Sequence, residues 1–310
     1  MKQLLSVLLI VCSFYALSQV NRKICISVDD LPLIKYGVKE VDHEWAITNG
    51  LIEAFEKHEV PAIGFVNAGK LYPNDQLDST RIAYLKKWLE SGMDLGNHTY
   101  AHKNYHRVSF EEYAQDIIDG EKVVKDLVTE FGKEYEFFRH PYLRSGNDDE
   151  SVQELLSFLA NNGYQESIVT VDDDDYLFAL AYSRAYRKKD QETMEKIGSS
   201  YLDYMEQKLI YFEEASIDLF DRNINHTLLI HANFLNARYL DELLTRYEKL
   251  GYTFISQKEA VSDPAYQTPV TKFGDWGISW IHKWGISVGK EQSFFDGDPK
   301  TPDFIRELSN

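Results

Sequence analysis

The feature of this sequence that most restricts its fold is the alternation of short apolar strand patterns with longer helix patterns. A strand pattern at 23–28, in which apolar and polar residues alternate, is followed by a helical stretch near 44–58 that Pro61 ends. Residues 62–66 have the next strand pattern, and the same order continues along the chain. Strands that alternate with helices form parallel sheets, because each helix carries the chain back to the start of the next strand.

The remaining units extend this order far enough to predict a closed barrel. Further strands are predicted at 93–96, 136–139, 167–171, 227–230 and 252–255, and further helices at 81–90, 109–131, 152–160 and 237–249. Six or more such units in one continuous run favour a closed barrel over an open, doubly wound sheet. No glycine-rich phosphate loop follows any strand pattern, so the sequence gives no support for a nucleotide site.

Two regions interrupt this order, and we interpret them as additions to one barrel domain at 19–310. Residues 176–223 have helical periodicity without a strand pattern, and two helices joined near Gly198 account for it. Residues 261–310 form a C-terminal extension that is rich in aromatic residues. We therefore expect an α/β barrel with a helical insertion and a C-terminal extension.

The start of the chain predicts export. Lys2 precedes an apolar stretch at 4–17, and residues 16–18 fit a small-x-small cleavage site, so we expect a signal peptide at 1–18. A membrane anchor is the alternative, but the apolar stretch is shorter than the about 20 residues that span a bilayer. The expected mature protein is periplasmic or secreted, without a stable membrane span.

Charge and cysteine content exclude several partners and ligands. The formal net charge of −17 argues against nucleic acid and anionic membranes, which bind cationic surfaces. Cleavage after residue 18 would leave Cys25 as the only cysteine, which excludes an internal disulfide and a cysteine-based zinc site. Any bound metal is therefore expected to have His, Asp or Glu ligands.

Polar residues follow the predicted strands at their carboxyl ends. They are Asp29 and Asp30, His98 and His102, Arg139, Asp172 to Asp175, and His231. In a parallel barrel these strand ends face one mouth, where active sites form. Their shared position, more than any single residue, indicates a functional site.

The pairs His98-x-x-x-His102 and Asp29-Asp30 together predict a metal site. Two imidazoles and one carboxylate are a common catalytic zinc set that leaves one position open for water. Adjacent carboxylates repel each other unless a cation intervenes, so one aspartate can bind metal while the other acts as a general base. The alternatives are two surface histidines and a polar turn.

Arg139, His231 and the acidic run at 172–175 each allow two interpretations. Arg139 either pairs with a carboxylate or is a solvated cation at the rim of the barrel. His231 is either an ordinary core or rim histidine or a general acid that faces the metal. The acidic run is either a solvated loop or a group that binds calcium or orients catalytic residues.

Taken together, these residues resemble the five motifs of the polysaccharide deacetylase family of carbohydrate esterases. Residues 27–32 (SVDDLP) stand in the place of Thr-Phe-Asp-Asp-Gly-Pro, and 98–102 (HTYAH) match His-Ser/Thr-x-x-His. Residues 139–142 (RHPY) match Arg-x-Pro-Tyr/Phe, 172–176 (DDDDY) approximate Asp-x-x-Asp-Trp, and 229–231 (LIH) match Leu-x-His. All five occur in the order of the family, and the resemblance covers about residues 23–260.

The resemblance implies a distorted (β/α) barrel that removes N-acetyl groups from a carbohydrate in a metal-dependent reaction. By this resemblance, Asp30, His98 and His102 bind a divalent metal, most commonly Zn²⁺. Asp29 is then the general base that takes a proton from the attacking water. A Lewis-acid metal suits this chemistry, because it lowers the pKa of a bound water to about 7.

The resemblance also assigns groups around the base and the leaving group. The backbone N–H of Tyr142 stabilises the oxyanion, and His231 protonates the departing amine. Arg139 orients Asp29, and Asp175 pairs with or tunes its neighbours. A poor leaving group such as an amine needs a general acid, and histidine is suited to that role near neutral pH.

Several departures from the family motifs affect the expected substrate more than the expected reaction. Leu31 replaces the motif glycine, so the turn is expected to differ or to occlude part of the cleft. Tyr176 replaces the usual tryptophan, which weakens the assignment of Asp175. The insertion at 176–223 is expected to form a lid or wall, and residues 232–233 to contribute a substrate contact.

Trp276, Trp280 and Trp284 are four residues apart in the C-terminal extension. We expect them to pack on the barrel as a helical stripe, with one of them at the cleft; stacking on sugar rings is the alternative. Three other functions remain open. They are hydrolysis of O-acetyl esters such as those of xylan, hydrolysis of a non-sugar amide, and glycan binding without catalysis on the same fold.

Overall fold

The structure is a computed structural model that describes residues 22–310, so the expected signal peptide at 1–18 lies outside the described residues. The strands are β1 (Lys23–Leu31), β2 (Ile63–Val66), β3 (Asp94–Asn97), β4 (Phe137–Phe138), β5 (Gln165–Glu166), β6 (His226–His231) and β7 (Thr253–Phe254). The helices are α1 (Val41–Lys57), α2 (Ser79–Glu90), α3 (Phe110–Glu130), α4 (Asp149–Asn161), α5 (Asp175–Lys188), α6 (Gln191–Phe220), α7 (Phe234–Lys249), α8 (Gln257–Val261), α9 (Trp280–Val288) and α10 (Asp303–Ser309). Within residues 22–310, no helix has the length and apolar character needed to cross a membrane.

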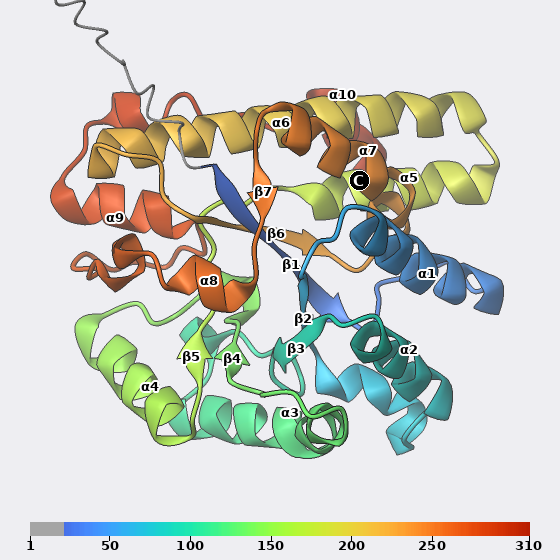
Figure 1. Cartoon of the computed structure of the whole chain (residues 1–310), viewed down its shortest axis with the longest axis horizontal. Helices are drawn as coiled ribbons and strands as arrows, with labels where there is room; N and C mark the ends of the chain where they lie inside the picture. The colour runs from blue at the N-terminus through green and yellow to red at the C-terminus, as the bar shows by residue number, and fades with distance from the viewer. Residues whose placement is uncertain (1–21) are drawn as a thin grey trace, which may run out of the picture.

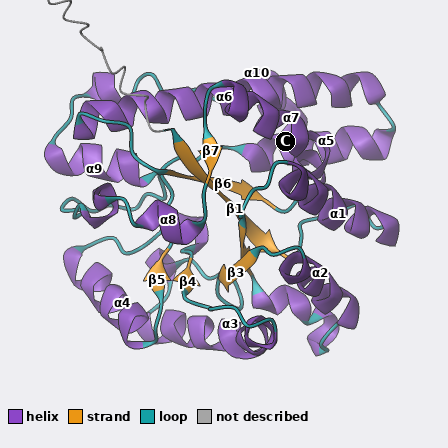
Figure 2. Ribbon diagram, viewed as in Figure 1, coloured by secondary structure: helices purple, strands orange, loops and turns teal. Residues whose placement is uncertain are grey.

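The predicted barrel is confirmed, with an irregular closure. Every strand pair is parallel, and the order is β5-β4-β3-β2-β1-β6, with β7 paired to the first residues of β1. The chain after β5 closes the ring against β6, because Val171 bridges Leu228 and the N–H groups of Thr170 and Val171 donate to the carbonyl of Thr227. Helices surround the strands on the outside (Figures 1 and 2).

The predicted strand at 167–171 is therefore wrong in extent. The structure gives a two-residue strand at 165–166 and a single bridge at Val171. One reason is that side chains replace regular backbone pairing in this segment. Thr170 Oγ1 accepts a hydrogen bond from the N–H of Thr227 at 2.8 Å, and Ser279 Oγ donates to the carbonyl of Thr170 at 2.7 Å.

The helical insertion contains two long helices, but their junction is not at Gly198. Helix α5 ends at Lys188, Lys189 adopts a left-handed conformation with φ 58°, and α6 continues without a break past Gly198. The glycine serves packing instead, because a Cβ atom at this position would lie 1.9 Å from Cζ of Tyr239 in α7. Helix α6 packs along α5, α7 and α9, so the insertion is part of the barrel wall.

The tryptophans of the C-terminal extension do not form one helical stripe. Trp276 precedes α9, whereas Trp280 and Trp284 lie within it and are buried. Trp284 packs edge-on against Phe220 at the end of α6, and its Nε1 donates to the carbonyl of Thr268 at 2.9 Å. The extension is therefore packed against the insertion and the barrel.

Candidate active site

A cavity of about 880 Å³ opens at the carboxyl ends of the barrel strands. It is lined by Asp29, Asp30, Ile34, Tyr36, His98, His102, Asn104, Tyr142, Leu143, Arg144, Asp172, Asp173, Asp174, Tyr176, Leu229, His231 and Gly277. Six of the eight residues that the resemblance gives a role are in this lining, and the other two, Arg139 and Asp175, are fully buried beside it. The structure thus brings the sequence motifs to one mouth.

An irregularity in β1 explains how two consecutive aspartates reach the same cavity. Successive side chains of a regular strand point to opposite faces. The pairing of β1 with β2 shifts register between Val28 and Leu31, and Asp30 has φ 68°, in the left-handed region. Bulges of this kind re-aim side chains and are frequent at barrel rims. Both Asp29 and Asp30 therefore line the mouth.

Asp30, His98 and His102 form a cluster with the geometry of a metal site. One donor atom from each residue lies within 4.8 Å of the others, and the two histidine Nε2 atoms are 3.2 Å apart. Asp30 Oδ1 is buried and lies 3.8 Å from Nε2 of His102. Among residues 22–310 this is the one cluster of His, Cys, Asp and Glu side chains with such spacing. The donor set fits a divalent ion of the zinc type.

The protonation of the two histidines suits metal binding. Burial lowers the pKa of His98 and of His102 to about 4, so both rings are neutral near pH 7. Nδ1 of His98 lies 2.9 Å from the carbonyl oxygen of Arg139. A carbonyl only accepts, so Nδ1 carries the proton and leaves the Nε2 lone pair facing the cluster.

Lys70, which the sequence analysis did not single out, contacts the same cluster. Its Nζ lies 3.1 Å from Oδ1 of Asp30 and donates to the carbonyl of Asp30 at 3.0 Å. Burial acts to raise the pKa of Asp30, but Lys70 and the neighbouring histidines hold it well below its usual range. No sequence motif marks this lysine; its only signal is its place after β2, at the same end of the barrel.

Asp29 is held by Arg139, whose side chain is 0% exposed. Nη1 of Arg139 donates to Asp29 Oδ1 at 3.0 Å, and Nη2 donates to the hydroxyls of Ser27 and Ser167 at 2.9 and 3.0 Å. The guanidinium also lies 4.5 Å from the centre of the Phe65 ring. Burial raises the pKa of Asp29, and Arg139 opposes that shift. Arg139 is therefore a positioning residue, and the interpretation as a solvated rim cation is wrong.

His231 is held in the same manner by Asp175, the first residue of α5. Nδ1 of His231 lies 2.6 Å from Asp175 Oδ1, and the backbone N–H of His231 donates to Asp175 Oδ2 at 2.9 Å. Burial alone would lower the pKa of His231, but the carboxylates of Asp175, Asp30 and Asp29 together raise it to about 10. The imidazole is therefore a cation with its Nε2 proton available. The partner of His231 in the acidic run is Asp175, its last member.

Asn233 does not contribute the substrate contact that was expected of residues 232–233. Its side chain accepts from the N–H of Asn236 at the start of α7 and donates to Asp175 Oδ2 at 3.3 Å. Both Ala232 and Asn233 are fully buried and are absent from the cavity lining. Asn236 also donates to Asp175 Oδ2 at 2.7 Å, so these amides fix the carboxylate that holds His231.

The rest of the acidic run forms one wall of the cavity. Asp172 Oδ2 accepts from the N–H of Ser279 at 2.9 Å, and Asp174 Oδ2 accepts from the hydroxyl of Thr301 at 2.6 Å. Asp172 Oδ1 and Asp173 Oδ2 are buried without a hydrogen-bond partner among residues 22–310. These carboxylates are tied to the C-terminal extension, so the run is not a freely solvated loop.

Two expectations about the shape of the cleft are wrong. Leu31 is 3% exposed and points into the core, where a Cβ atom on Gly64 would lie 2.0 Å from its Cδ1. It does not occlude the cavity, because Gly64 leaves room for it inside the barrel. No tryptophan of the described chain lines this cavity, and Trp276 and Trp280 line a separate one of about 240 Å³.

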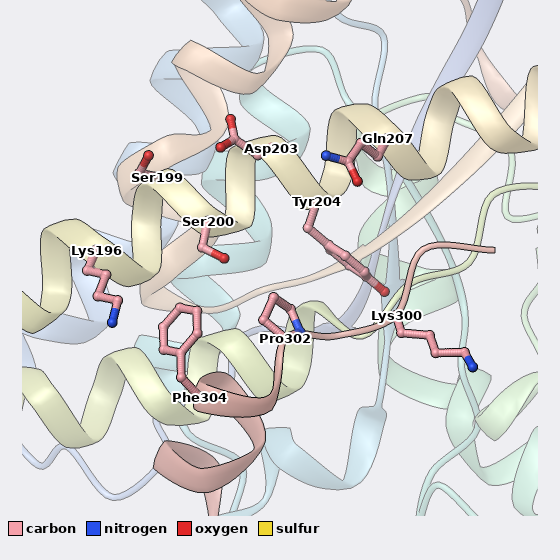
Figure 3. Close-up of a pocket in the computed structure, with 9 residues that line it drawn as sticks. All are labelled: Lys196, Ser199, Ser200, Asp203, Tyr204, Gln207, Lys300, Pro302 and Phe304. Atoms are coloured by element: carbon pink, nitrogen blue, oxygen red, sulfur yellow. The ribbon is translucent and has the colours of Figure 1, made fainter. Parts of the chain in front are cut away.

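Another cavity, of about 390 Å³, lies between α6 and the chain that leads into α10 (Figure 3). Lys196 and Phe304 face each other across it, with Nζ 4.5 Å from the centre of the ring. Its lining includes no residue of the Asp30, His98 and His102 cluster. The candidate active site is therefore the cavity at the carboxyl ends of the strands.

Comparison with known proteins gives one family match. Residues 18–163, just under half of the chain, match the family described as polysaccharide deacetylase. The matched segment contains Asp29, Asp30, His98, His102 and Arg139, whereas Asp175 and His231 lie beyond it. Over this segment the chain is similar to the polysaccharide deacetylase family. No curated protein sequence gives a significant match.

Solved structures of CE4 family proteins match this chain, and one of them, with a TM-score of 0.50, indicates a similar fold. A mutant of a CE4 family pseudoenzyme is 13% identical with a TM-score of 0.50, over 78% of this chain and 67% of that chain. The wild-type pseudoenzyme is from Bacillus anthracis. A mutant peptidoglycan deacetylase from Bacillus subtilis is 17% identical with a TM-score of 0.46, over 78% of this chain and 92% of that chain. A family 4 carbohydrate esterase from Streptomyces lividans, in complex with acetate, is 15% identical with a TM-score of 0.45, over 78% and 96% of the two chains.

Proposed function

We propose that this protein is an exported, divalent-metal-dependent hydrolase that removes N-acetyl groups from a glycan, with Zn²⁺ as its metal. The observation that carries the proposal is the convergence of three groups on one cavity. They are the cluster of Asp30, His98 and His102, the base Asp29, and the acid His231. The structure of a pseudoenzyme is similar in fold, so the fold alone does not decide activity. In this chain, the metal cluster, the general base and the general acid each have candidate residues.

The residues of this chain divide the reaction between them. A bound divalent ion would polarise the acetyl carbonyl and favour ionisation of the attacking water. Asp29 takes the proton of that water, and because Arg139 binds its Oδ1, the other oxygen remains for the transfer. The backbone N–H of Tyr142, in the turn beside the ring of His102, donates to the oxyanion.

The leaving group decides between amide and ester substrates. An amine leaves only after it gains a proton, whereas an alkoxide needs less assistance. His231 lies in the cavity lining, and the neighbouring carboxylates, Asp175 above all, raise its pKa to about 10, so it carries the required proton across the neutral range. This arrangement favours N-acetyl groups over O-acetyl esters.

The walls of the cavity favour a neutral or amine-bearing glycan over an anionic one. Asp172, Asp173 and Asp174 line one side of the cavity, so the residues on this side are acidic. The rings of Tyr142 and Tyr176 are partly exposed at the rim, and flat aromatic faces suit pyranose rings. The net charge of −17 would repel polyanionic glycans over a longer range.

Acetate release from a panel of substrates tests this function. The mature protein is assayed with chitooligosaccharides, peptidoglycan fragments and acetylated xylan, before and after chelation and zinc add-back. We expect chelator-sensitive release from one N-acetylated class. Release from xylan alone would replace the proposal with an O-acetyl esterase, and bound glycan without release would indicate a binding protein.

The variant Asp29→Asn separates catalysis from metal binding. We expect it to keep stoichiometric zinc and lose turnover, because Asp29 is assigned the proton transfer and lies outside the metal cluster. The matched control is Asp241→Asn, which removes a surface carboxylate paired with Lys57 and His58. Full activity of Asp29→Asn would contradict the assignment of the base.

A further inference from the structure

The turn that carries Tyr142 is contacted by the C-terminal extension. We call residues 141–146 the oxyanion loop and residues 275–283 the clamp segment. Lys283 in α9 is 4% exposed, and its Nζ donates to the carbonyl of Leu143 at 2.9 Å and to Ser145 Oγ at 3.3 Å. Its Nζ also lies 3.4 Å from the centre of the Trp280 ring. A buried amine thus binds the residue that follows Tyr142.

Gly277 brings the clamp segment into backbone contact with Tyr142 itself. A Cβ atom at Gly277 would lie 1.8 Å from the carbonyl oxygen of Tyr142, so only glycine permits this approach. Asp275 forms a second tie, because its carboxylate is 3.4 Å from Nη1 of Arg144. The clamp segment therefore contacts four consecutive residues of the oxyanion loop, 142–145.

The clamp segment is itself fixed to the barrel. Ser279 Oγ donates to the carbonyl of Thr170 at 2.7 Å, and the N–H of Trp280 donates to the carbonyl of Val169 at 2.8 Å. These contacts are made where the chain closes the ring against β6. Contact with the clamp segment therefore sets the position of the oxyanion loop relative to the barrel.

The backbone of the oxyanion loop needs such support. Tyr142 and Leu143 have φ values of 59° and 54°, which is the left-handed region for two consecutive residues that are not glycine. Residues persist in this conformation when their surroundings fix it. The same contacts place an amine in an unfavourable environment, since burial lowers the pKa of Lys283 to about 7.

We propose that the clamp segment positions the backbone N–H of Tyr142 for oxyanion stabilisation, with Lys283 as the positioning residue. The inference rests on the proposed deacetylase function. It extends the catalytic apparatus to a part of the chain that lies beyond the matched segment at 18–163. Lys283 touches neither substrate nor metal in this arrangement; it acts through the carbonyl of Leu143.

The test is Lys283→Met, which keeps an unbranched apolar stem over Trp280 and removes the donor. We expect kcat to fall roughly ten- to a hundredfold, because displaced oxyanion donors and small misplacements have effects of this order. KM and zinc stoichiometry should stay unchanged. The matched control is Lys290→Met, which removes a lysine that binds the carbonyl of Asp218, away from the oxyanion loop.

Hydrogen exchange measured on a peptide covering 139–147 provides a readout that does not need activity. The N–H groups of Leu143 and Arg144 bond within the turn, to the carbonyls of His140 and Pro141. Lys283→Met should speed their exchange, and Lys290→Met should not. If wild-type protein releases no acetate, the proposed function fails, and this exchange still decides whether Lys283 holds the loop.

Unchanged kcat together with unchanged exchange in Lys283→Met would overturn the inference. If that variant does not fold, Gly277→Ala replaces it, since it keeps Lys283 and its Cβ would meet the carbonyl oxygen of Tyr142 at 1.8 Å. Gly277→Ala should lower kcat with KM retained, and wild-type kcat in that variant would also overturn the inference.

Discussion

Asp175→Asn is the substitution that most directly tests the assigned acid. The Asp175 carboxylate accepts from the ring and backbone N–H of His231, at 2.6 and 2.9 Å, and from the side-chain amides of Asn236 and Asn233, at 2.7 and 3.3 Å. An asparagine of the same shape has one acceptor oxygen and an NH₂ group that faces a donor. His231 therefore loses its charge partner and the contact that fixes its Nδ1 proton.

The expected magnitude follows from the role of a general acid, which contributes roughly 10²- to 10⁴-fold to the rate. On an N-acetyl sugar, kcat of Asp175→Asn should fall by about that factor. On an aryl acetate the fall should be less than about tenfold, because a phenolate leaves without protonation. The difference between the two substrates measures proton donation apart from structural damage.

The pH profile supplies a second measure with a definite sign. The active form of His231 is protonated, and in the wild type its pKa is raised to about 10. The alkaline limb of kcat should therefore lie well above neutral pH. Removal of the Asp175 charge lowers the pKa of His231 toward its ordinary value of about 6.5, so the alkaline limb moves to lower pH. The histidine then loses its proton in the neutral range.

The assay compares steady-state rates on both substrates from pH 6 to 10, with Asp263→Asn as control. Asp263 is a buried carboxylate bound by Arg222 and by the N–H of Asn225, and it lies outside the cavity lining. The Asp263→Asn control therefore measures the general effect of neutralising a buried aspartate. Equal losses on the amide and the aryl ester, or an alkaline limb that does not move, would refute the reasoning.

Three further predictions concern metal binding and stability. His98→Ala should lose stoichiometric zinc in metal analysis of the dialysed protein, and retained metal would contradict the ligand assignment. Burial lowers the pKa of His226 to about 4. The neutral imidazole therefore contributes fully to the stability of the folded state above pH 6.5, and this contribution is lost as the pH falls toward 4. His226→Gln should therefore remove about 2 kcal/mol of the acid dependence in denaturant titrations at pH 7 and 4.5, and an unchanged dependence would count against this. Gly198→Ala should lower the free energy of unfolding by about 1–3 kcal/mol, because its Cβ would meet the ring of Tyr239; an unaltered midpoint would show that the ring moves freely.

The order of strands and helices could be predicted from the sequence because periodicity is a local property. The β1 pattern, the helices around the barrel and the position of polar residues at strand ends all depend on a few neighbouring residues. Motif order then indicated which polar residues share a mouth, and the structure places Asp29, His98, His102 and His231 around one cavity. These features required no knowledge of contacts between distant segments.

Features that depend on distant segments could not be predicted. The pattern at 167–171 indicated a full strand, but side-chain contacts at Thr170 leave only one bridge. Gly198 resembled a helix end, whereas its role is to admit a ring from α7. Leu31 was expected either to change the turn or to occlude part of the cleft, and the space left by Gly64 lets it lie in the core.

The sequence by itself determined the barrel, the metal-ligand set and the identities of the base and the acid as candidates. The tertiary structure decided how each is controlled. Asp29 pairs with Arg139, which is 110 positions away in the sequence. The carboxylate of Asp175 holds His231. Lys283 contacts the oxyanion loop, at a residue 140 positions away. The physical reason is that the protonation state and orientation of a buried charged group depend on its partners. Tertiary packing, and not proximity in sequence, determines which residues those partners are.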